Sequence, residues 1–500
     1  MGKFNETKRG YNTKPDTTNV AGMSAFSRDD IKKEIASVIL NSMLNGDSYY
    51  EKEKDRIEKI SKYISDNQEL SEFIAKAMVY TRTEGNLRSV SHLIGTVLAE
   101  NAKGTSFLKN ALYKSMIRPD DATEMVALWN SRNNKSIPNS MRRAIKKALE
   151  QRFDGYQLKK YYGTGAVKVS NLINIAHPKP RDEYQKEIFK MVLENRLPNI
   201  DTAQTVNASG TENRAEKYEA MLSEGKMGYM AVLKNLKNIL EAEPSDNVIE
   251  MIVEVLTNKN RVLKSRILPF RFMQAYEAVE IISMDKFKRN KILKAIEQGF
   301  IYSAGNIPIV EEGEKVAILL DESGSMGGMW SKSIQKTPFY IGKVLMASML
   351  TGLDKDNTIG YLWADNVREV NINQSPMTFM KNMHTRGGGT NLGQAITDLI
   401  NTKTVVDKIV IFTDMQENSI GGYWGGKRFS EMVKDYKKIN PNVKILFWNL
   451  EGYAGGTPLK MSDNVLEVNG YSDSILKVVS KIWEDKDALI KEIENISLEV

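Results

Sequence analysis

Three oxygen-bearing side chains follow one strongly apolar run. The run occupies residues 316–320 (Val-Ala-Ile-Leu-Leu), and Asp321, Ser323 and Ser325 come directly after it. Five apolar residues without alternation predict a short strand buried on both faces. One carboxylate and two hydroxyls on the next loop are hard donors, which a Mg²⁺-sized cation accepts while it keeps part of its water shell. The loop therefore predicts part of a divalent-cation site.

Two downstream segments offer further donors. Residues 385–391 form a glycine run that contains Thr390, and residues 408–413 form a second apolar run that ends at Asp414. Ligands of open parallel sheets gather outside the carboxyl ends of the strands, so we expect both residues to join the first loop. A polar turn is the alternative for the first loop alone, but three segments in this order favour the cation site.

The order Asp-x-Ser-x-Ser, Gly-Gly-Thr and a strand-end Asp resembles a von Willebrand factor A (vWA) domain. In that family the five matching positions form the metal-ion-dependent adhesion site (MIDAS). The resemblance implies Mg²⁺ as the first choice of cofactor, held by Asp321, Ser323, Ser325, Thr390 and Asp414.

Composition limits the class of protein. The chain has 500 residues, more than one ordinary core needs, so at least two domains are expected. It contains no cysteine and only three histidines, which excludes disulfides and thiolate zinc sites and disfavours a histidine-based metal enzyme. No apolar run is long enough to span a bilayer, and the polar N-terminus is no secretory signal. We therefore expect a cytoplasmic protein that does not associate with a membrane.

Positive charge is concentrated in the first part of the chain. Residues 1–310 hold 49 lysines and arginines against 38 acidic residues, a net of +11, whereas residues 311–500 have a net of −4. Residues 101–200 alone hold 19 basic and 9 acidic residues. Such a split indicates a nucleic-acid-binding module joined to another domain.

The first part has a helical pattern. Val90, Leu93, Ile94, Val97 and Leu98 follow the spacing of one apolar helix stripe, and similar patterns continue for more than two hundred residues. Prolines fall between these patterns, as helix boundaries should. Stacked helix pairs of the HEAT type and an irregular helical bundle are both compatible with the periodicity.

Several segments resemble the TROVE domain of the Ro60/Rsr family, and this likeness favours the helical-repeat ring. They are residues 77–92 (AMVYTRTEGNLRSVSH), 137–143 (IPNSMRR), 176–180 (AHPKP), 233–238 (LKNLKN) and 268–272 (LPFRF). They occur in this order ahead of the vWA-like part, so the likeness covers nearly the whole chain. It implies an RNA-binding protein.

The pattern changes after a linker at residues 303–308. Strands are predicted at residues 316–320, 358–363, 408–413 and 443–450, and helices at 338–353 and 473–483. This alternation predicts a doubly wound α/β sheet. The expected domains are an unstructured arm at residues 1–25, an α-solenoid TROVE domain at 26–305 and a vWA-like domain at 306–500.

Lys159 and Lys160 lie beside two tyrosines and lead to Lys168 and His177. Lysines can neutralise phosphates, and adjacent tyrosines can stack on unpaired bases. Lys160 and His177 also match positions that contact Y RNA in the resembling family, but a further basic position of that family is Thr164 here. The alternatives are a solvated helix end and, for His177, a histidine satisfied inside a helix junction.

A second basic group lies on one predicted helix. Arg142 and Lys146, and likewise Arg143 and Lys147, are four residues apart, so like charges crowd one side. Repulsion among these like charges costs stability unless a bound anion neutralises it. This favours an RNA-binding surface over a helix face that only contacts solvent.

The resemblance implies small structured Y-like RNAs on the outer surface and single-stranded 3′ ends in the central hole, with roles in noncoding RNA quality control. It also suggests an exoribonuclease partner; we expect a monomer without preference for DNA. No catalytic residues are predicted, because the cation site lacks an obvious general base. The alternative function is a protein-binding adaptor whose bound cation takes an acidic residue of the partner.

Overall fold

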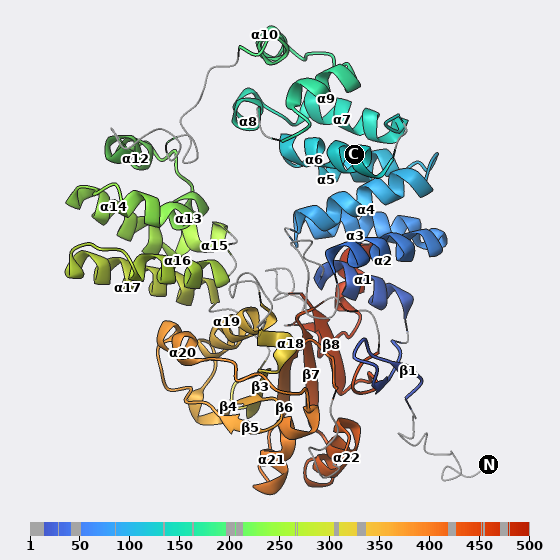
Figure 1. The fold of residues 1–500 in the computed structure, drawn as a ribbon, viewed down its shortest axis with the longest axis vertical. Helices are drawn as coiled ribbons and strands as arrows, with labels where there is room; N and C mark the ends of the chain where they lie inside the picture. Colours follow the sequence, from blue (N-terminus) through green and yellow to red (C-terminus); the bar gives the residue numbers. More distant parts are fainter. Residues whose placement is uncertain are drawn as a thin grey trace.

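The computed structural model describes most of the chain. The residues described are 15–28, 30–41, 52–85, 87–133, 136–162, 165–196, 206, 214–265, 267, 269–304, 310–327, 337–418, 427–451, 453, 456–470, 479 and 481–499. Figure 1 shows helices in two arms, and both arms rest on a part that contains the main sheet.

The first helical arm is built from consecutive helices that pack in pairs. The stripe predicted from Val90 to Leu98 lies in α4 and is fully buried against α3 and α6. Pro119 is the first residue of α6 and Pro138 caps the start of α7, so these prolines mark helix starts as predicted. The helices of this arm are α1 (Ile31–Asn41), α2 (Glu53–Asp66), η1 (Gln68–Leu70), α3 (Ser71–Thr83), α4 (Arg88–Asn101), α5 (Leu108–Ser115), α6 (Pro119–Arg132), α7 (Asn139–Gln151), α8 (Gly155–Lys160), α9 (Val169–Ala176) and α10 (Glu183–Leu193).

The second helical arm repeats this organisation. Helices α13 and α16 pack together, as do α14 and α17, and an aromatic group of Tyr229, Phe272 and Phe300 joins them. The helices are α12 (Arg214–Ser223), α13 (Tyr229–Leu240), α14 (Asp246–Thr257), α15 (Lys259–Ser265), α16 (Phe270–Glu280) and α17 (Lys286–Ala304).

The main sheet has the order β5-β4-β3-β6-β7-β8, with the β5 edge antiparallel and the other pairings parallel. Its strands are β3 (Val316–Asp321), β4 (Thr358–Trp363), β5 (Val367–Glu369), β6 (Lys408–Thr413), β7 (Lys444–Asn449) and β8 (Val465–Asn469). Val316, Ile318 and Leu320 face one hydrophobic core, and Ala317 and Leu319 face the other. This is why the sequence run does not alternate: both faces of β3 are buried.

Helices cover both faces of this sheet, as the doubly wound prediction requires. One core contains α19 (Pro338–Leu350) and α20 (Pro376–Asn382), and the other contains residues of η4 (Leu392–Ile396), α21 (Thr397–Asn401) and α22 (Phe429–Ile439). Short elements are α18 (Gly324–Gly327), η3 (Lys355–Asn357) and α24 (Ala488–Glu494). Strands β5 and β8 were not predicted.

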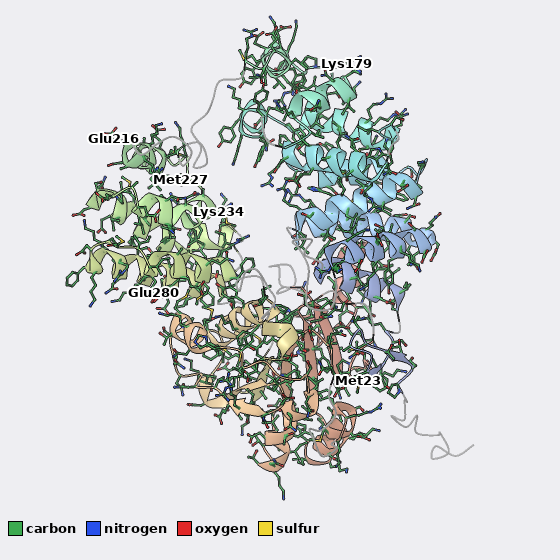
Figure 2. All side chains as sticks on the ribbon, in the orientation of Figure 1. Met23, Lys179, Glu216, Met227, Lys234 and Glu280 are labelled. Atoms are coloured by element: carbon green, nitrogen blue, oxygen red, sulfur yellow. The ribbon has the colours of Figure 1, made fainter. Side chains whose placement is uncertain are left out.

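Both arms are fastened to this part of the chain. Tyr340 of α19 donates a hydrogen bond to Glu277 of α16 (3.4 Å), and Glu280 at the base of the second arm pairs with Lys381 of α20 (Figure 2). On the other side, α1 packs against β8, and α24 packs against α3. One continuous core runs through the described parts of both arms and one face of the sheet.

The prediction that residues 1–25 have no structure of their own is wrong for residues 15–25. Strands β1 (Thr17–Thr18) and β2 (Ser24–Ala25) form a hairpin, and Phe26 pairs with Thr457 beyond the main sheet. The order comes from contacts more than 390 residues away, which local composition does not reveal. Residues 1–14, most of the predicted linker and most of the helix predicted at 473–483 lie outside the described residues. The predicted domain boundaries remain a prediction.

Candidate functional site

The five predicted cation ligands come together at the carboxyl ends of β3 and β6. These strands are parallel neighbours, with Leu320 paired to Phe412, so Asp321 and Asp414 leave the sheet side by side. Ser323 lies directly after β3, and Ser325 lies in the short helix α18 that follows. The five side chains are 0–4% exposed: Asp321, Ser323, Ser325, Thr390 and Asp414.

Hydrogen bonds fix part of this group and leave two oxygen atoms without a partner. The Ser323 amide donates to Asp321 Oδ1 at 2.9 Å, and Thr413 Oγ1 donates to Asp321 Oδ2 at 2.7 Å. The hydroxyl oxygens of Ser323 and Ser325 are 3.3 Å apart. Within the described residues, Thr390 Oγ1 and Asp414 Oδ2 are buried without a hydrogen-bond partner. Such orphaned acceptors are costly unless a ligand or ion completes them.

The buried carboxylates of Asp321 and Asp414 repel each other when both are charged. Burial raises the pKa of Asp321, and the neighbouring Asp414 raises it further. Burial also raises the pKa of Asp414. A divalent cation would relieve both costs. No three His, Cys, Asp or Glu residues cluster as metal ligands in the described segments, so the donor set here depends on hydroxyls. Two carboxylates and three hydroxyls fit a hard cation that retains water.

Glu322 is a supporting residue that the sequence analysis did not identify. It is almost fully buried, and its carboxylate receives two hydrogen bonds from Arg368, at 3.0 and 2.7 Å. Its backbone oxygen accepts from Thr385 Oγ1 at 2.6 Å, and the amide of Arg386 contacts its carboxylate. Glu322 therefore ties the loop after β3 to the glycine run that carries Thr390. Its position between Asp321 and Ser323 could have drawn attention to it. Its partner Arg368, which is 46 positions away, could not be recognised from the sequence.

Glycines let the two loops approach closely. The Gly324 amide donates to the Gly388 carbonyl at 3.1 Å. Gly388 has a φ of +112°, and a Cβ there would lie 2.5 Å from Asp365 Oδ2. A Cβ on Gly327 would lie 2.5 Å from a Thr385 methyl. The glycine run thus has a conformational reason as well as a chemical one.

The predicted RNA residues after α8 lie mostly on the surface. Lys160 and Lys168 are exposed and Lys159 is half-buried. His177 is exposed too, at the C-cap of α9 with a φ of 47°. The alternative of a histidine satisfied inside a helix junction is therefore wrong.

Tyr161 is half-buried and already engaged by cations. Lys160 Nζ lies 5.5 Å and Arg118 Cζ 5.4 Å from the centre of its ring. Tyr162 donates a hydrogen bond to Asn195. Arg118 was not identified from the sequence, because it is more than 40 residues away. The structure brings a second cation to this ring and leaves less of it open for a base.

Two of the four basic residues on α7 are exposed, and the other two contact neighbouring side chains. Arg142 and Arg143 are exposed, whereas Lys146 Nζ lies 3.9 Å from Glu150 Oε1. Lys147 Nζ lies 5.0 Å from the centre of the Tyr113 ring on α5.

Three further cations, missed in the sequence, surround Lys147. Burial lowers the pKa of Lys147, and the charges of Lys109, Arg152 and Lys114 lower it further. Arg152 Cζ lies 4.1 Å from the centre of the Tyr113 ring and donates to the carbonyls that end α5. Lys114 Nζ donates to the Ser497 carbonyl at 2.8 Å. This Tyr113 cluster (Lys109, Lys114, Lys147 and Arg152) arises because α5 packs against α7, which spacing within one helix cannot show.

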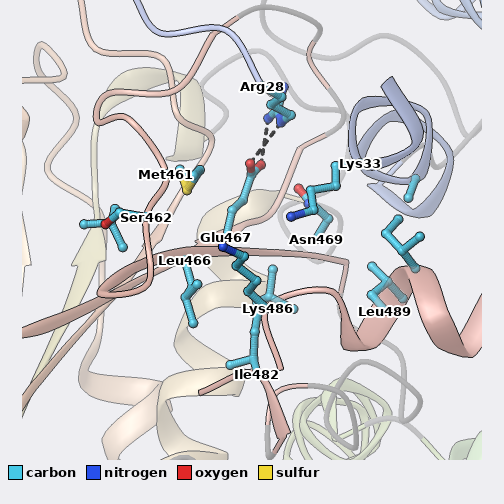
Figure 3. Close-up of a pocket in the computed structure, with 14 residues that line it drawn as sticks. Arg28, Lys33, Met461, Ser462, Leu466, Glu467, Asn469, Ile482, Lys486 and Leu489 are labelled. Carbon is cyan, nitrogen blue, oxygen red and sulfur yellow. Dashed lines mark hydrogen bonds and ion pairs between the residues drawn. The ribbon is translucent and has the colours of Figure 1, made fainter. Parts of the chain in front are cut away.

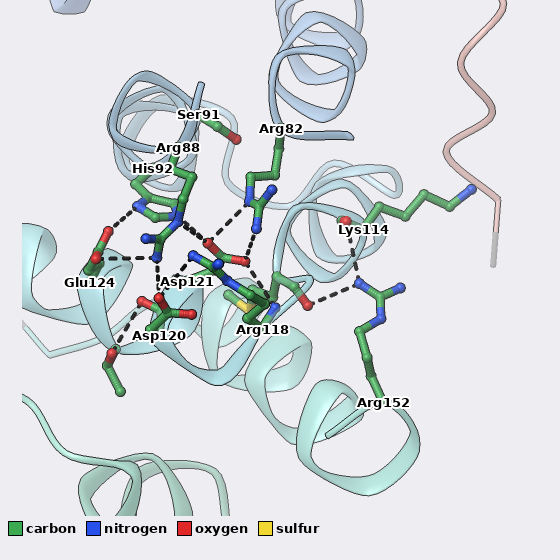
Figure 4. A network of polar contacts seen from close by, with 12 residues as sticks. Arg82, Arg88, Ser91, His92, Lys114, Arg118, Asp120, Asp121, Glu124 and Arg152 are labelled. Atoms are coloured by element: carbon green, nitrogen blue, oxygen red, sulfur yellow. Dashed lines mark hydrogen bonds and ion pairs between the residues drawn. The ribbon is translucent and has the colours of Figure 1, made fainter. Parts of the chain in front are cut away.

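A buried ionic network holds the helices behind Arg118 (Figure 4). Asp121 at the start of α6 accepts from Arg82 of α3 at 2.7 Å and from Arg88 of α4 at 3.0 Å. His92 lies between Asp121 and Glu124, with nitrogen–oxygen distances of 3.2 and 3.0 Å. Burial lowers the pKa of His92, but hydrogen bonds to both carboxylates outweigh burial and raise it. The network joins three helices and is structural.

Comparisons with known proteins agree with this architecture. Residues 206–317 match the sequence model of the TROVE domain family. This part of the chain is therefore similar to the TROVE domain. The match covers α12 to α17 of the second arm, and the exposed lysines and His177 above lie outside it. The predicted resemblance to the Ro60/Rsr family is confirmed.

Two named relatives match a short stretch of the chain. Telomerase protein component 1 of Rattus norvegicus is 35% identical over 68 residues, which is 14% of this chain and 3% of that protein. The Mus musculus protein is 34% identical over the same length. The chain therefore matches only a small part of these relatives.

A solved structure shares the fold over nearly the whole chain. The crystal structure of the Deinococcus radiodurans Ro (Rsr) protein aligns with a TM-score of 0.60 at 15% identity, covering 91% of this chain and all of that one. The predicted fold class, a helical-repeat region followed by a vWA-like α/β region, is confirmed. Among the helices described, none is long and apolar enough to cross a membrane.

Proposed function

We propose that this protein binds RNA through the first helical arm and forms a ribonucleoprotein. The observation that carries the proposal is the Tyr113 cluster beside exposed Arg142 and Arg143, a surface on which six cations gather. Phosphate groups would relieve the repulsion among these cations. The TROVE match and the positive net charge of residues 1–310 support the same function.

We further propose small structured, Y-like RNAs and single-stranded 3′ ends as ligands, in noncoding RNA quality control with an exoribonuclease partner. The solvent-facing lysines at 160 and 168 and His177 support a surface contact with such RNA. We propose that it acts in the cytoplasm. We propose a binding role without catalysis.

A salt titration of RNA binding tests the proposal. Each contact with a single-strand phosphate adds about 0.7 to the slope of log K against log salt. Lys147→Ala and Lys160→Ala should each weaken binding and flatten the slope by about that much. Lys438→Ala, an exposed lysine on α22, is the matched control and should change neither quantity. Unchanged slopes in both test variants, or no affinity for RNA in dilute buffer, would contradict the proposal.

A second function is supported by the orphaned oxygens of Thr390 and Asp414. We propose that these two residues, with Asp321, Ser323 and Ser325, hold a divalent cation, with Mg²⁺ as first choice. The bound cation supplies a positive centre that an acidic side chain of a protein partner can complete. This chain's residues position the ion, and the two buried carboxylates offset its charge.

The two functions are separable because they use different parts of the chain. Calorimetry should show Mg²⁺ binding to the wild type and none to Asp321→Ala. RNA affinity should survive both EDTA and Asp321→Ala, since the cationic surface lies on the first arm. Loss of RNA binding under either condition would contradict this division. Sequencing the RNA that co-purifies with the chain would identify the ligand class.

A further inference from the structure

The N-terminal hairpin lies directly against the loop that carries the cation ligand Asp414. We name residues 15–28 the N-terminal strap. At its tip, Asn19 Nδ2 donates to the Glu417 carbonyl at 2.7 Å, in a buried contact. The amides of Val20 and Ala21 donate to Gln416 Oε1 at 2.8 and 3.2 Å. Three hydrogen bonds thus join the strap to residues 416 and 417.

Gln416 links the strap to the ligand residue Asp414. It is 2% exposed, its amide donates to Asp414 Oδ1 at 3.0 Å, and its Nε2 donates to the Asp414 carbonyl at 3.2 Å. Both polar atoms of its side chain are engaged: Nε2 donates to the ligand residue and Oε1 accepts from the strap. The bond at Oδ1 leaves Oδ2 of Asp414 for a cation.

The same loop has a strained backbone and also holds a second ligand. Met415 has a φ of 65°, which is unusual for a residue with a side chain and persists where surrounding contacts enforce it. The Thr390 amide donates to Asn418 Oδ1 at 2.8 Å, and the Asn418 amide donates to the Thr390 carbonyl at 3.2 Å. The loop of residues 414–418 therefore positions both ligands with orphaned oxygens.

The rest of the strap contacts the loop between β7 and β8 and then β8 itself. Phe26 and Thr457 exchange backbone hydrogen bonds of 3.0 and 2.8 Å. Arg28 pairs with Glu467 of β8 at 2.7 and 2.9 Å, and Figure 3 shows this pair in the pocket between α1 and the sheet. Both charged side chains are nearly buried, so the pair is a firm attachment. Helix α1 begins three residues later.

We propose that the N-terminal strap supports the cation centre. The strap holds Gln416, and Gln416 is the positioning residue that orients the carboxylate of Asp414. This inference rests on the proposed cation site. Outer partners that orient metal ligands change metal affinity by about 10- to 100-fold when removed. Cation affinity should therefore depend on residues some 400 positions away, and cation binding should in turn stabilise the strap.

The test measures cation affinity in the full chain. Titration calorimetry with Mg²⁺ and Mn²⁺ compares the wild type with Gln416→Ala and Asn19→Ala. Both variants should raise the Kd by about 10-fold or more. Gln185→Ala is the matched control, because Gln185 is equally buried and hydrogen-bonded through both side-chain atoms but lies on α10. It should leave the Kd unchanged. Asn19→Ala keeps the test valid if Gln416→Ala does not fold.

Amide hydrogen exchange gives a second measurement. If the strap only stabilised the fold, its exchange rates would not depend on Mg²⁺. Addition of Mg²⁺ to the wild type should slow exchange of the Val20 and Ala21 amides, and this protection should be absent in Asp414→Ala. If the wild type binds the cation but both strap-side variants bind it equally well and exchange is unchanged, the strap inference is overturned while the cation site stands. If neither cation binds the wild type, the site itself is overturned and the inference with it.

Discussion

Replacing Asp121 with asparagine tests how far the first arm depends on one buried carboxylate. Asp121 is 0% exposed, and its oxygens contact Arg82, Arg88 and His92 as well as the backbone amide of Arg118. Burial would raise the pKa of Asp121, but hydrogen bonds from His92 and Arg82 hold it far below its usual range. An asparagine keeps one acceptor oxygen and removes the charge, so buried cations lose their counterion.

The expected loss follows from this burial. Removing one partner of a buried ion pair costs about 3–5 kcal/mol, because the remaining charge stays in a poorly solvated place. We expect Asp121→Asn to lower the free energy of unfolding by that amount. Urea titration followed by helical circular dichroism measures it.

A neighbouring carboxylate supplies the control. Glu124 contacts His92 and Arg88 but has a half-exposed side chain, so Glu124→Gln should cost about 1 kcal/mol or less. A loss for Asp121→Asn no larger than that of this control would refute the argument that the buried charge stabilises the arm.

Three further outcomes are expected. The raised pKa of His92 means that its stabilising contribution is full below its ordinary pKa of 6.5 and is lost as pH rises through the folded value, so the stability difference between the wild type and His92→Gln should shrink from about pH 5 to about pH 8. Gly342→Ala should lower the free energy of unfolding by about 1–3 kcal/mol, because the added Cβ would lie 2.4 Å from a Leu320 methyl carbon; thermal unfolding measures this loss. Arg368→Ala should weaken Mg²⁺ binding in calorimetry, because it removes the two hydrogen bonds that hold the Glu322 side chain and so loosens the loop that carries Asp321 and Ser323.

Each of these has a matched control or a contrary result. Gly352→Ala is the control for the packing change, because its nearest neighbour would be 3.8 Å away. A stability difference for His92→Gln that grows with pH would contradict the assigned direction of the pKa shift. Lys403→Ala removes an exposed cation of the same part of the chain and should leave Mg²⁺ affinity unchanged.

Local patterns were sufficient for the central strands β3, β4 and β6 and for the oxygen-bearing side chains that follow two of them. The predicted strands at 358–363 and 408–413 match β4 and β6, and the run at 316–320 matches β3 except for its last residue. A strand buried on both faces needs a continuous apolar run, and a ligand at its carboxyl end needs a polar residue next to it. Both requirements are met by neighbours in the sequence, so they can be read from it.

The supports of these ligands depend on contacts between distant residues. Gln416 meets the strap across 396 positions, and Glu322 meets Arg368 across 46. The Tyr113 cluster likewise requires α5 to pack against α7, which brings Lys147 close to Lys109 and Lys114. The sequence by itself determined which side chains offer oxygen donors or positive charge for the proposed ligands. Only the tertiary structure decided which partners orient them, because hydrogen bonds and charge repulsion act over a few ångströms of space and are indifferent to separation along the chain.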